Sequence, residues 1–414
     1  MTALRRHSSL AVLLPVLLAA GLFVAVPARA DEVPVVRAAD TPAEGTRDLT
    51  FQPRWTAGGE DDAETILGVV GRVLPGPGGQ VLVLDSQLAQ VTVFGPDGSV
   101  VRTLGRQGDG PGEVQNAGDM LLLPDGTVGI IQLFPGKIVK LHTDGTPAGT
   151  FQPGGAEAAA AGGFNVLVRG KTHGDRVGLV GIRQQFAQGK LSQTRFLAVY
   201  TADGTLLAEL LTRAVALDFS NLVLDEKEQD FCWERWDFLP DGGVVAAPER
   251  DRYTLTFYSP AGEPVRRVER AYPPLRREPQ DLERQRALLK AQGRFYPSPP
   301  RVVVAETEPA VEQVIVRDDG TVWVLSGRGM LDNPAGVLAT YDVYDTAGRF
   351  LRRVAVHGEG DPRDDYLYLL DGNRAALVRG LRSASLASMG GQDGSDDADA
   401  EAAPLELIVG ELVP

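Results

Sequence analysis

The hydrophobic and polar positions of this chain repeat as short apolar runs separated by tight polar turns. One unit shows Val-Leu-Val-Leu-Asp at residues 81–85, Val-Thr-Val-Phe at residues 91–94 and an Asp-Gly pair at residues 97–98. Similar units begin near residues 125 and 241. Short apolar and β-branched runs bounded by glycine turns predict β-strands. Their repetition predicts one antiparallel unit stacked several times along the chain.

Two glycine turns mark each unit, because glycine adopts positive φ without a steric penalty. The turn after the innermost strand falls at Gly79, Gly126, Gly174, Gly242 and Gly320, and the turn before the outermost strand falls at Gly98, Gly145, Gly204, Gly262 and Gly348. The two turns lie 19 or 20 residues apart in three units, and 30 and 28 residues apart in the third and fifth. Inserts at residues 184–193 and 328–337 account for the longer spacings. This pattern is typical of a four-stranded antiparallel module.

The chain contains six such modules by this count. The sixth is expected to begin with a turn at residues 364–365, followed by strands at residues 366–371 and 405–413. It lacks an outer strand, and the strand predicted at residues 48–52 is available to fill that place. The predicted fold class is therefore all-β: a six-bladed β-propeller of four-stranded antiparallel blades, closed by its N-terminal strand.

The remaining segments lie outside the repeat. Residues 1–30 have a basic start, an apolar run and an Ala-Arg-Ala end, which predicts a signal peptide cleaved near Ala30. Residues 31–46 are expected to form a flexible leader, and the propeller to span residues 47–414. The insert at residues 272–300 contains a predicted helix at 279–290. Residues 383–403 are acidic and low in complexity, which predicts a disordered loop.

The repeated strings resemble NHL-type repeats, and the whole chain resembles the exported bacterial six-bladed β-propeller family. The resemblance rests on residues 81–85 and 91–98, on the glycine-rich linker at 104–113 and on its echo at 356–362. It covers roughly residues 48–380 and the last strand. It implies the fold and leaves the function open, because such propellers include binding proteins and several types of enzyme.

Charge and cysteine content narrow the compartment and the partners. The formal charge is −14, and it becomes −17 once the three arginines of residues 1–30 are removed. An acidic field repels phosphates, so no nucleic-acid partner is expected. No later run is apolar for long enough to predict stable membrane insertion. We expect a periplasmic or secreted protein, whose single cysteine, Cys232, is a buried thiol that forms no intrachain disulfide.

The charged and longer loops are expected on one face of the propeller, where the blade-to-blade links and the loops between strands two and three lie. Loops on a rigid scaffold commonly carry recognition, although most charged loop residues are simply solvated. The candidates for a ligand-binding face are Asp85, Arg106, Asp109, Glu113, Asp119, Glu249, Arg250, Asp251, Arg252, Arg328, Asp332, His357, Glu359 and Asp361.

Catalytic signatures are weak in this sequence. It has no Gly-x-Ser-x-Gly elbow, Cys232 has no nearby histidine, and the histidines are too few and scattered for a closed zinc site. A calcium ion (Ca2+) in a carboxylate-lined central channel is more plausible, because hard cations take six to eight oxygen ligands. The residues expected near the inner strands are Asp119, His173, Asp175, Glu234 and Asp237. We therefore favour a binding module for a peptide, protein or glycan, with Trp236 available for sugar stacking. The alternative is a lyase or lactone hydrolase that uses a divalent cation.

Overall fold

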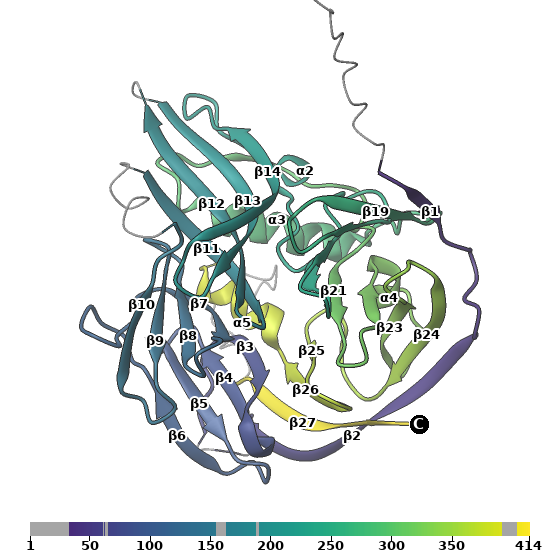
Figure 1. Cartoon of the computed structure of the whole chain (residues 1–414), viewed down its shortest axis with the longest axis horizontal. Helices are drawn as coiled ribbons and strands as arrows, with labels where there is room; N and C mark the ends of the chain where they lie inside the picture. The colour runs from purple at the N-terminus through teal and green to yellow at the C-terminus, as the bar shows by residue number, and fades with distance from the viewer. Residues whose placement is uncertain (1–32, 61, 63–64, 155–162, 188–189, 391–403) are drawn as a thin grey trace, which may run out of the picture. The chain divides into compact units, whose positions relative to one another are not determined.

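The computed structural model describes all residues except 1–32, 61, 63–64, 155–162, 188–189 and 391–403. The predicted signal peptide and most of the predicted acidic loop therefore lie outside the described residues. The rest of the chain is built mainly from four-stranded antiparallel sheets that follow one another along the sequence (Figure 1).

The first three sheets each contain four consecutive strands. The first is β3 (Val70–Pro75), β4 (Val81–Asp85), β5 (Gln90–Phe94) and β6 (Val100–Leu104). The second is β7 (Ala117–Leu122), β8 (Val128–Gln132), β9 (Lys137–Leu141) and β10 (Pro147–Phe151). The third is β11 (Gly163–His173), β12 (Arg176–Ala187), β13 (Lys190–Thr201) and β14 (Leu206–Ala216). The insert expected at residues 184–193 extends the β12–β13 hairpin, because its residues continue the antiparallel register.

The fourth sheet gains an extra strand from the predicted leader. Its own strands are β16 (Trp236–Phe238), β17 (Val244–Ala246), β18 (Thr254–Tyr258) and β19 (Pro264–Glu269). β1 (Val35–Arg37) pairs in parallel with β19, with Val36 opposite Val268. The prediction of a flexible leader is therefore wrong for β1, because the open edge of β19 offers unpaired backbone groups that this segment satisfies.

Two further groups of strands form one eight-stranded sheet joined by β2 (Thr46–Gly58). One group is β21 (Gln313–Val316), β22 (Val322–Leu325), β23 (Val337–Tyr344) and β24 (Phe350–His357); the other is β25 (Tyr366–Leu369), β26 (Arg374–Arg379) and β27 (Glu406–Val413). β2 runs antiparallel to β27 and parallel to β24. The N-terminal strand predicted at residues 48–52 thus lies within β2 and supplies the fourth strand of the last group.

The structure corrects the expected start of the sixth module. Its first turn is at Gly372, where φ is +55°, and not at residues 364–365. Residues 366–369 form the innermost strand β25, and the sequence pattern did not predict β26. Charged residues, Arg374 and Arg379, stand at the two ends of β26 and shorten its apolar run, although Ala375 and Val378 between them are fully buried.

Short helices and one small sheet occupy the connections. They are η1 (Pro77–Gly79), α2 (Glu226–Gln229), α3 (Pro279–Gly293), α4 (Gly327–Leu331), α5 (Leu381–Ser388), and the parallel pair of β15 (Val223–Asp225) with β20 (Arg301–Val303). α3 lies where a helix is predicted. The prediction of a disordered loop is wrong for its first residues, which belong to α5. Ala384 and Leu386 pack into the fold there, and the Ser383 hydroxyl donates to Asp364. None of the described helices is long and apolar enough to cross a membrane.

Buried apolar side chains join each group of strands to the next and the last group back to the first. Each of the six clusters among the described residues contains side chains from two neighbouring groups of strands. Examples, one pair of members for each cluster, are Val91 and Ile130, Ile131 and Phe196, Val199 and Trp236, Tyr253 and Val324, Tyr341 and Leu377, and Val83 and Val378. Each apolar sheet face is therefore covered by a neighbouring sheet, which is the condition for burying both faces of an antiparallel sheet.

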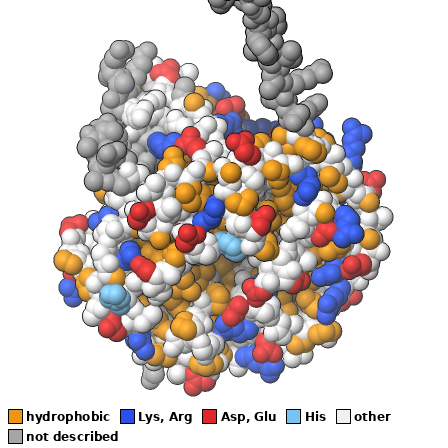
Figure 2. Space-filling view, viewed as in Figure 1, with side chains coloured by type: hydrophobic (Ala, Val, Ile, Leu, Met, Phe, Trp, Pro, Cys, Tyr) orange, Lys and Arg blue, Asp and Glu red, His pale blue; other side chains and the backbone are white. Residues whose placement is uncertain are grey.

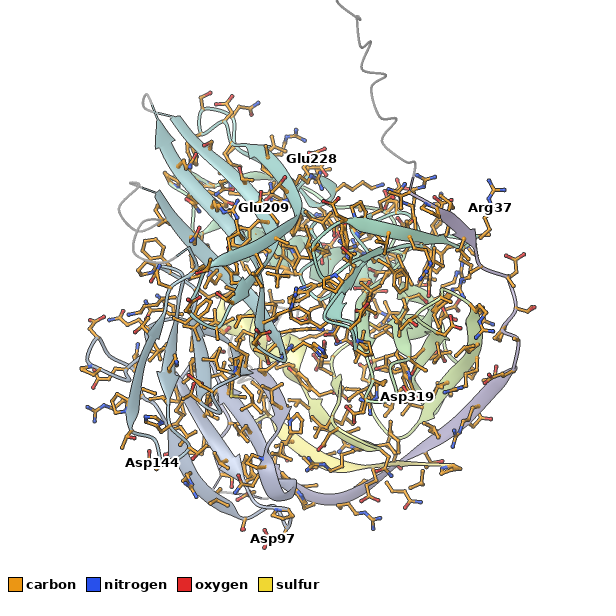
Figure 3. The ribbon with its side chains drawn as sticks, viewed as in Figure 1. Arg37, Asp97, Asp144, Glu209, Glu228 and Asp319 are labelled. Atoms are coloured by element: carbon orange, nitrogen blue, oxygen red, sulfur yellow. The ribbon has the colours of Figure 1, made fainter. Side chains whose placement is uncertain are left out.

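The antiparallel alternation divides the connections between two faces. We call the face with the tight glycine turns the turn face, and the face with the sheet-to-sheet links and the strand-two-to-three loops the loop face. At the turns, Asp97, Asp144 and Asp319 (Figure 3) accept hydrogen bonds from the hydroxyl two residues ahead. For Asp97 and Asp144 these bonds lower the pKa of the carboxyl group.

We predict that closure by β2 depends on Phe51, which is 6% exposed and packs against β27 and β24. Phe51→Ala should lower the free energy of unfolding by about 3 kcal/mol because it opens a cavity at the closing seam. Thr50→Ala, at the exposed neighbouring position of the same strand, should change it by less than about 0.5 kcal/mol. Urea denaturation followed by tryptophan fluorescence measures both, and equal losses in the two variants would contradict this role of Phe51.

Candidate functional site

The innermost strands bring six charged side chains together at the centre of the sheets. We call this set the central cluster: Arg72 on β3, Asp119 on β7, Arg169 and Lys171 on β11, and Glu234 and Asp237 at β16. It contains three cationic groups and three carboxylates. The cluster is therefore formally neutral and is held together by its own ion pairs.

Glu234 is the hub of the central cluster. Its carboxylate pairs with Arg169, and its Oε2 lies 3.6 Å from Arg72 Nη1. Burial acts to raise the pKa of Glu234, but the two arginines outweigh it and lower the pKa. Asp119 is fully buried, accepts from the Gly170 amide at 2.8 Å and lies 3.4 Å from Arg72. Here burial dominates and raises the pKa of Asp119.

The carboxylates predicted to bind calcium in the channel do not fit that ion. Asp237 Oδ2 lies 3.1 Å from Lys171 Nζ and accepts from the Val316 amide at 3.0 Å, while Asp119 and Glu234 face arginines. A calcium ion needs six to eight oxygen ligands, whereas these three carboxylates each lie beside a cationic side chain of the cluster. Nowhere in the described ranges do three or more His, Cys, Asp or Glu gather as a metal site.

A cavity of about 340 Å³ opens from the central cluster toward the turn face. Its walls include the apolar side chains of Leu74, Leu122 and Val316, and its floor includes Lys171 and Asp237. Figure 2 shows hydrophobic side chains gathered toward the middle of the viewed face, among scattered charges of both signs. Lys171 also donates to the Trp236 carbonyl at 2.8 Å, so the polar floor is internally satisfied.

Two smaller cavities of about 210 and 140 Å³ lie on the loop face. We call them the outer and inner pockets, and together the loop-face hollow. They share the lining residues Glu312, Met330 and Arg382. These come from three connections: the link before β21, helix α4 between β22 and β23, and helix α5 between β26 and β27. The Ser326 hydroxyl caps α4 by accepting from the Gly329 amide at 3.0 Å, which fixes the turn that carries Met330.

Glu312 has the most unusual environment among the described carboxylates of the loop face. Its carboxylate makes no hydrogen bond or ion pair with any described residue, although its backbone amide donates to Leu325 at 2.8 Å. Burial and then the charge of Glu308 raise the pKa of Glu312 to about 7, against the weaker effects of Arg382, Arg235 and Arg277. Glu312 therefore changes its charge near neutral pH, as ligand-binding and catalytic carboxyl groups often do.

Arg382 is the cationic counterpart in the same hollow. Its Nη2 lies 3.0 Å from the Met330 sulfur, a weak acceptor, and among the residues that the structure describes it pairs with no carboxylate. Its backbone amide donates to the Asp364 carbonyl at 3.0 Å and fixes the start of α5. A partly buried guanidinium without an anionic partner retains donors for a ligand.

The surrounding charges, in contrast, are paired. Glu226 accepts from Arg277 at 2.6 Å and from Arg250 at 2.7 Å, and Arg277 also reaches Glu308 at 2.8 Å. Burial acts to raise the pKa of Glu226, but the Arg277 bond and charge prevail and lower it. This buried network ties α2, the α3 insert and the β17–β18 loop into a rigid wall beside the outer pocket.

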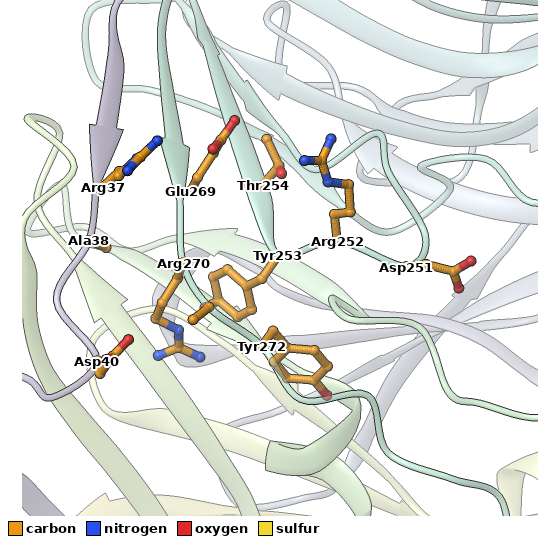
Figure 4. A pocket seen from close by; sticks show the side chains of 11 residues that line it. Arg37, Ala38, Asp40, Asp251, Arg252, Tyr253, Thr254, Glu269, Arg270 and Tyr272 are labelled. Carbon is orange, nitrogen blue, oxygen red and sulfur yellow. The ribbon is translucent and has the colours of Figure 1, made fainter.

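A third loop-face pocket of about 460 Å³ lies beside β1 (Figure 4). Arg37, Glu269 and Thr254 stand in a row across β1, β19 and β18, above Tyr253 and Tyr272. Arg270 stacks 4.1 Å from the Tyr253 ring and donates to Asp342 at 2.6 Å. Its charge is therefore already matched by an ion pair that is 6% exposed on both sides.

The structure separates the sequence-predicted site residues. Arg106 and Glu113 pair with each other at 2.5 Å, and Glu113 accepts from the Gly110 amide, which lowers its pKa. Asp109 accepts from Gln115 at 2.7 Å. These three residues close the turn of their own linker. Asp119 lies in the central cluster and not on the loop face, because β7 is an innermost strand.

The other predicted residues are dispersed as well. Arg250 is 6% exposed and belongs to the Glu226 network, whereas Asp251 and Arg252 line the pocket beside β1 and Arg252 lies 3.4 Å from Glu249.

The predicted residues of the later loops bond to their own surroundings. Arg328 donates to the Pro273 carbonyl at 2.8 Å and pairs with Asp332. His357 Nε2 lies 2.9 Å from Asp48 across β24 and β2, and Glu359 and Asp361 are exposed. Asp85 caps its own loop by accepting from the Gly68 and Leu88 amides.

Sequence reasoning missed the residues that line the loop-face hollow. Glu312 precedes an ordinary strand, and Arg382 follows Gly380 just before the low-complexity segment. Neither has a motif or spacing that marks it. Only their position on converging loops, with no ion pair to another described residue, distinguishes them from other charged loop residues. Cys232, by contrast, is buried as predicted, and burial raises the pKa of its thiol to about 12.

No protein-family model and no curated protein matches this sequence. Among solved structures, a member of the DUF4221 family from Bacteroides vulgatus is similar over 88% of this chain and 98% of its own, at 7% identity and a TM-score of 0.47. A candidate exported protein from Bacteroides fragilis is similar over 92% and 99%, at 11% identity and a TM-score of 0.46. Regucalcin, a calcium-binding protein from Agrobacterium tumefaciens, is similar over 88% and 96%, at 12% identity and a TM-score of 0.41. At TM-scores below 0.5 these likenesses carry no argument about function.

We predict that Arg169 stabilises the central cluster. Arg169→Ala should lower the free energy of unfolding by about 2 kcal/mol or more, because it leaves the partly buried Glu234 carboxylate without its closest partner. Arg349→Ala, which removes a 77% exposed arginine from an ion pair with Asp345, should cost less than about 0.5 kcal/mol. Chemical denaturation measures both variants, and a neutral Arg169→Ala would show that the cluster contributes no net stability.

We predict that Glu312 makes stability depend on pH. Its pKa of about 7 lies above the usual 4.5, so the folded protein retains a proton that the unfolded chain releases. The free energy of unfolding should therefore fall as pH rises from about 4.5 to about 7. Glu312→Gln should remove this dependence and be more stable than wild type at pH 8 by up to about 3 kcal/mol, with little gain at pH 4. Glu359→Gln, at an exposed carboxylate, is the matched control, and equal gains at both pH values would contradict the assignment.

Proposed function

We propose that this chain is an exported six-bladed β-propeller that acts as a binding module for a peptide, protein or glycan on its loop face. The six apolar clusters and the closing strand β2 support six blades, and the sequence of residues 1–30 supports export to the periplasm or the medium. The NHL type of the repeat stays a prediction from sequence.

One observation carries the binding proposal. The outer and inner pockets lie where the connections of the last three blades converge, and both are lined by Glu312 and Arg382. The neighbouring wall residues Glu226, Arg250 and Arg277 are saturated by one another. A hollow on a rigid scaffold that retains an unpaired acid and an unpaired base is suited to orient a polar ligand of limited size.

The alternative, an enzyme with a divalent cation in the central channel, gains no support from the donor set. The channel carboxylates Asp119, Glu234 and Asp237 each face a cationic side chain of the same cluster. A cation entering there would have to displace these partners or the backbone amides that the carboxylates accept from. The geometry therefore favours recognition on the loop face over chemistry in the channel.

We predict that ligands of this protein depend on Arg382. In a thermal-shift screen of free amino acids, tripeptides and oligosaccharides, at least one compound should raise the melting temperature of the wild type. Arg382→Ala should reduce that shift strongly, because a charged hydrogen-bond donor is lost from the hollow. Arg349→Ala, an exposed arginine next to a turn-face glycine turn, should retain the full shift. A ligand affected equally by both variants, or a screen without any stabilising compound, would contradict a loop-face site.

A further inference from the structure

We propose that the loop-face hollow binds a free apolar α-amino acid, with its carboxylate on Arg382 and its ammonium on Glu312. The apolar side chain of the ligand occupies the inner pocket. This inference rests on the proposed loop-face binding function and names the chemistry of its ligand.

The two pockets differ in character, and this difference gives the ligand its direction. The outer pocket is lined by charged side chains, among them Asp281, Arg284 and Arg363. The inner pocket is walled by Leu325, Leu338, Ala339, Tyr341 and Leu367. Glu312, Met330 and Arg382 stand at the junction of the two. A ligand with a charged head and an apolar tail therefore matches the hollow only when its head lies at the junction.

Of the other polar groups in the inner pocket, Glu234, Asp365 and Gln313 are bonded within the chain, whereas the buried Tyr341 hydroxyl has no hydrogen-bond partner among the described residues. Asp365 accepts from the Asp361 amide at 2.8 Å and from the Gly380 amide at 3.0 Å. Gln313 Nε2 donates to the Tyr366 hydroxyl at 2.8 Å. The pocket therefore offers the ligand's side chain a largely apolar wall with one unpartnered hydroxyl, that of Tyr341. Its size agrees with one branched aliphatic chain or one aromatic ring, since an apolar cavity of about 150 Å³ holds a benzene molecule.

The two groups at the junction have opposite charges and no carboxylate–guanidinium bond between them. Arg382 offers N–H donors in a planar fork, which suits a carboxylate. Glu312 offers an acceptor pair whose burial is unfavourable unless a cationic group compensates for it. A zwitterion supplies both partners at once, whereas a simple anion or a simple cation would leave one of the two groups unsatisfied.

The test is isothermal titration of the mature protein with L-leucine and three analogues at pH 8. L-leucine should bind, and leucinamide and N-acetyl-L-leucine should each bind about tenfold or more weakly, because each lacks one charged group. Glycine should also bind at least about tenfold more weakly, because it leaves the inner pocket empty. Equal affinity for all four compounds, or no heat from L-leucine at millimolar concentration, would overturn the proposal.

Two variants assign each charge to its residue. In Arg382→Ala, L-leucine and leucinamide should bind with the same affinity, because the variant has no guanidinium with which the carboxylate of L-leucine could interact. In Glu312→Gln, L-leucine and N-acetyl-L-leucine should become equal for the corresponding reason. Circular dichroism checks that both variants fold, and Arg349→Ala should bind all compounds like the wild type. Unchanged discrimination in a folded Arg382→Ala or Glu312→Gln protein would show that the residue does not contact the ligand.

Dipeptides separate a free amino acid from a chain end. Leu-Gly and Gly-Leu should both bind at least about tenfold more weakly than L-leucine, because the leucine residue of each lacks either the α-carboxylate or the α-ammonium. A dipeptide that binds as well as L-leucine would show that the site takes a peptide end and would overturn this inference. If leucine compounds fail but another ligand still depends on Arg382, this inference is wrong and the loop-face function stands. If no ligand depends on Arg382, both are wrong.

Discussion

The pairing of β2 with β27 is the constraint on which the rest of the structure depends. A set of antiparallel sheets packed face to face leaves the first and last units exposed unless the two ends of the chain are joined. β2 supplies that join by completing the last group of strands and continuing to β24. At the bulge near Pro53 the backbones approach so closely that a Cβ at residue 410 would lie 2.2 Å from the Gln52 carbonyl oxygen, which explains Gly410.

The join between the last and first groups of strands determines how charged side chains are arranged at the centre of the sheets. Because the innermost strands converge, their polar side chains leave water together, and each must find a partner there. The central cluster meets this need with matched cations and carboxylates. The Glu226 network does the same between the links of the loop face. In the lining of the two loop-face pockets, Glu312 and Arg382 differ from Glu226 and Arg277 because neither makes an ion pair with another described residue.

The chemistry of the loop-face hollow also follows from its position. Its walls come from helices α4 and α5 and from the link before β21, which lie far apart in sequence. Each connection contributes a different property: Glu312 an acid, Arg382 a base, and α4 the apolar Met330 between them. None of the loops could form the hollow alone. The pocket therefore depends on the scaffold that holds the connections in place, as is common for binding sites on loops.

Sequence alone determined the strands, their grouping into repeated modules and the role of the N-terminal strand, because glycine turns and apolar alternation are local signals. It failed at β26, whose ends carry arginines, and at β1 and the start of α5, whose order comes from pairing with distant segments. It also selected Arg106, Glu113 and Arg250 as site residues because they are charged loop residues. Only the tertiary structure showed that their charges are neutralised by neighbours and that Glu312 and Arg382 have no such partners among the described residues. Whether a charge is paired depends on residues far away in the chain, and no local pattern contains that information.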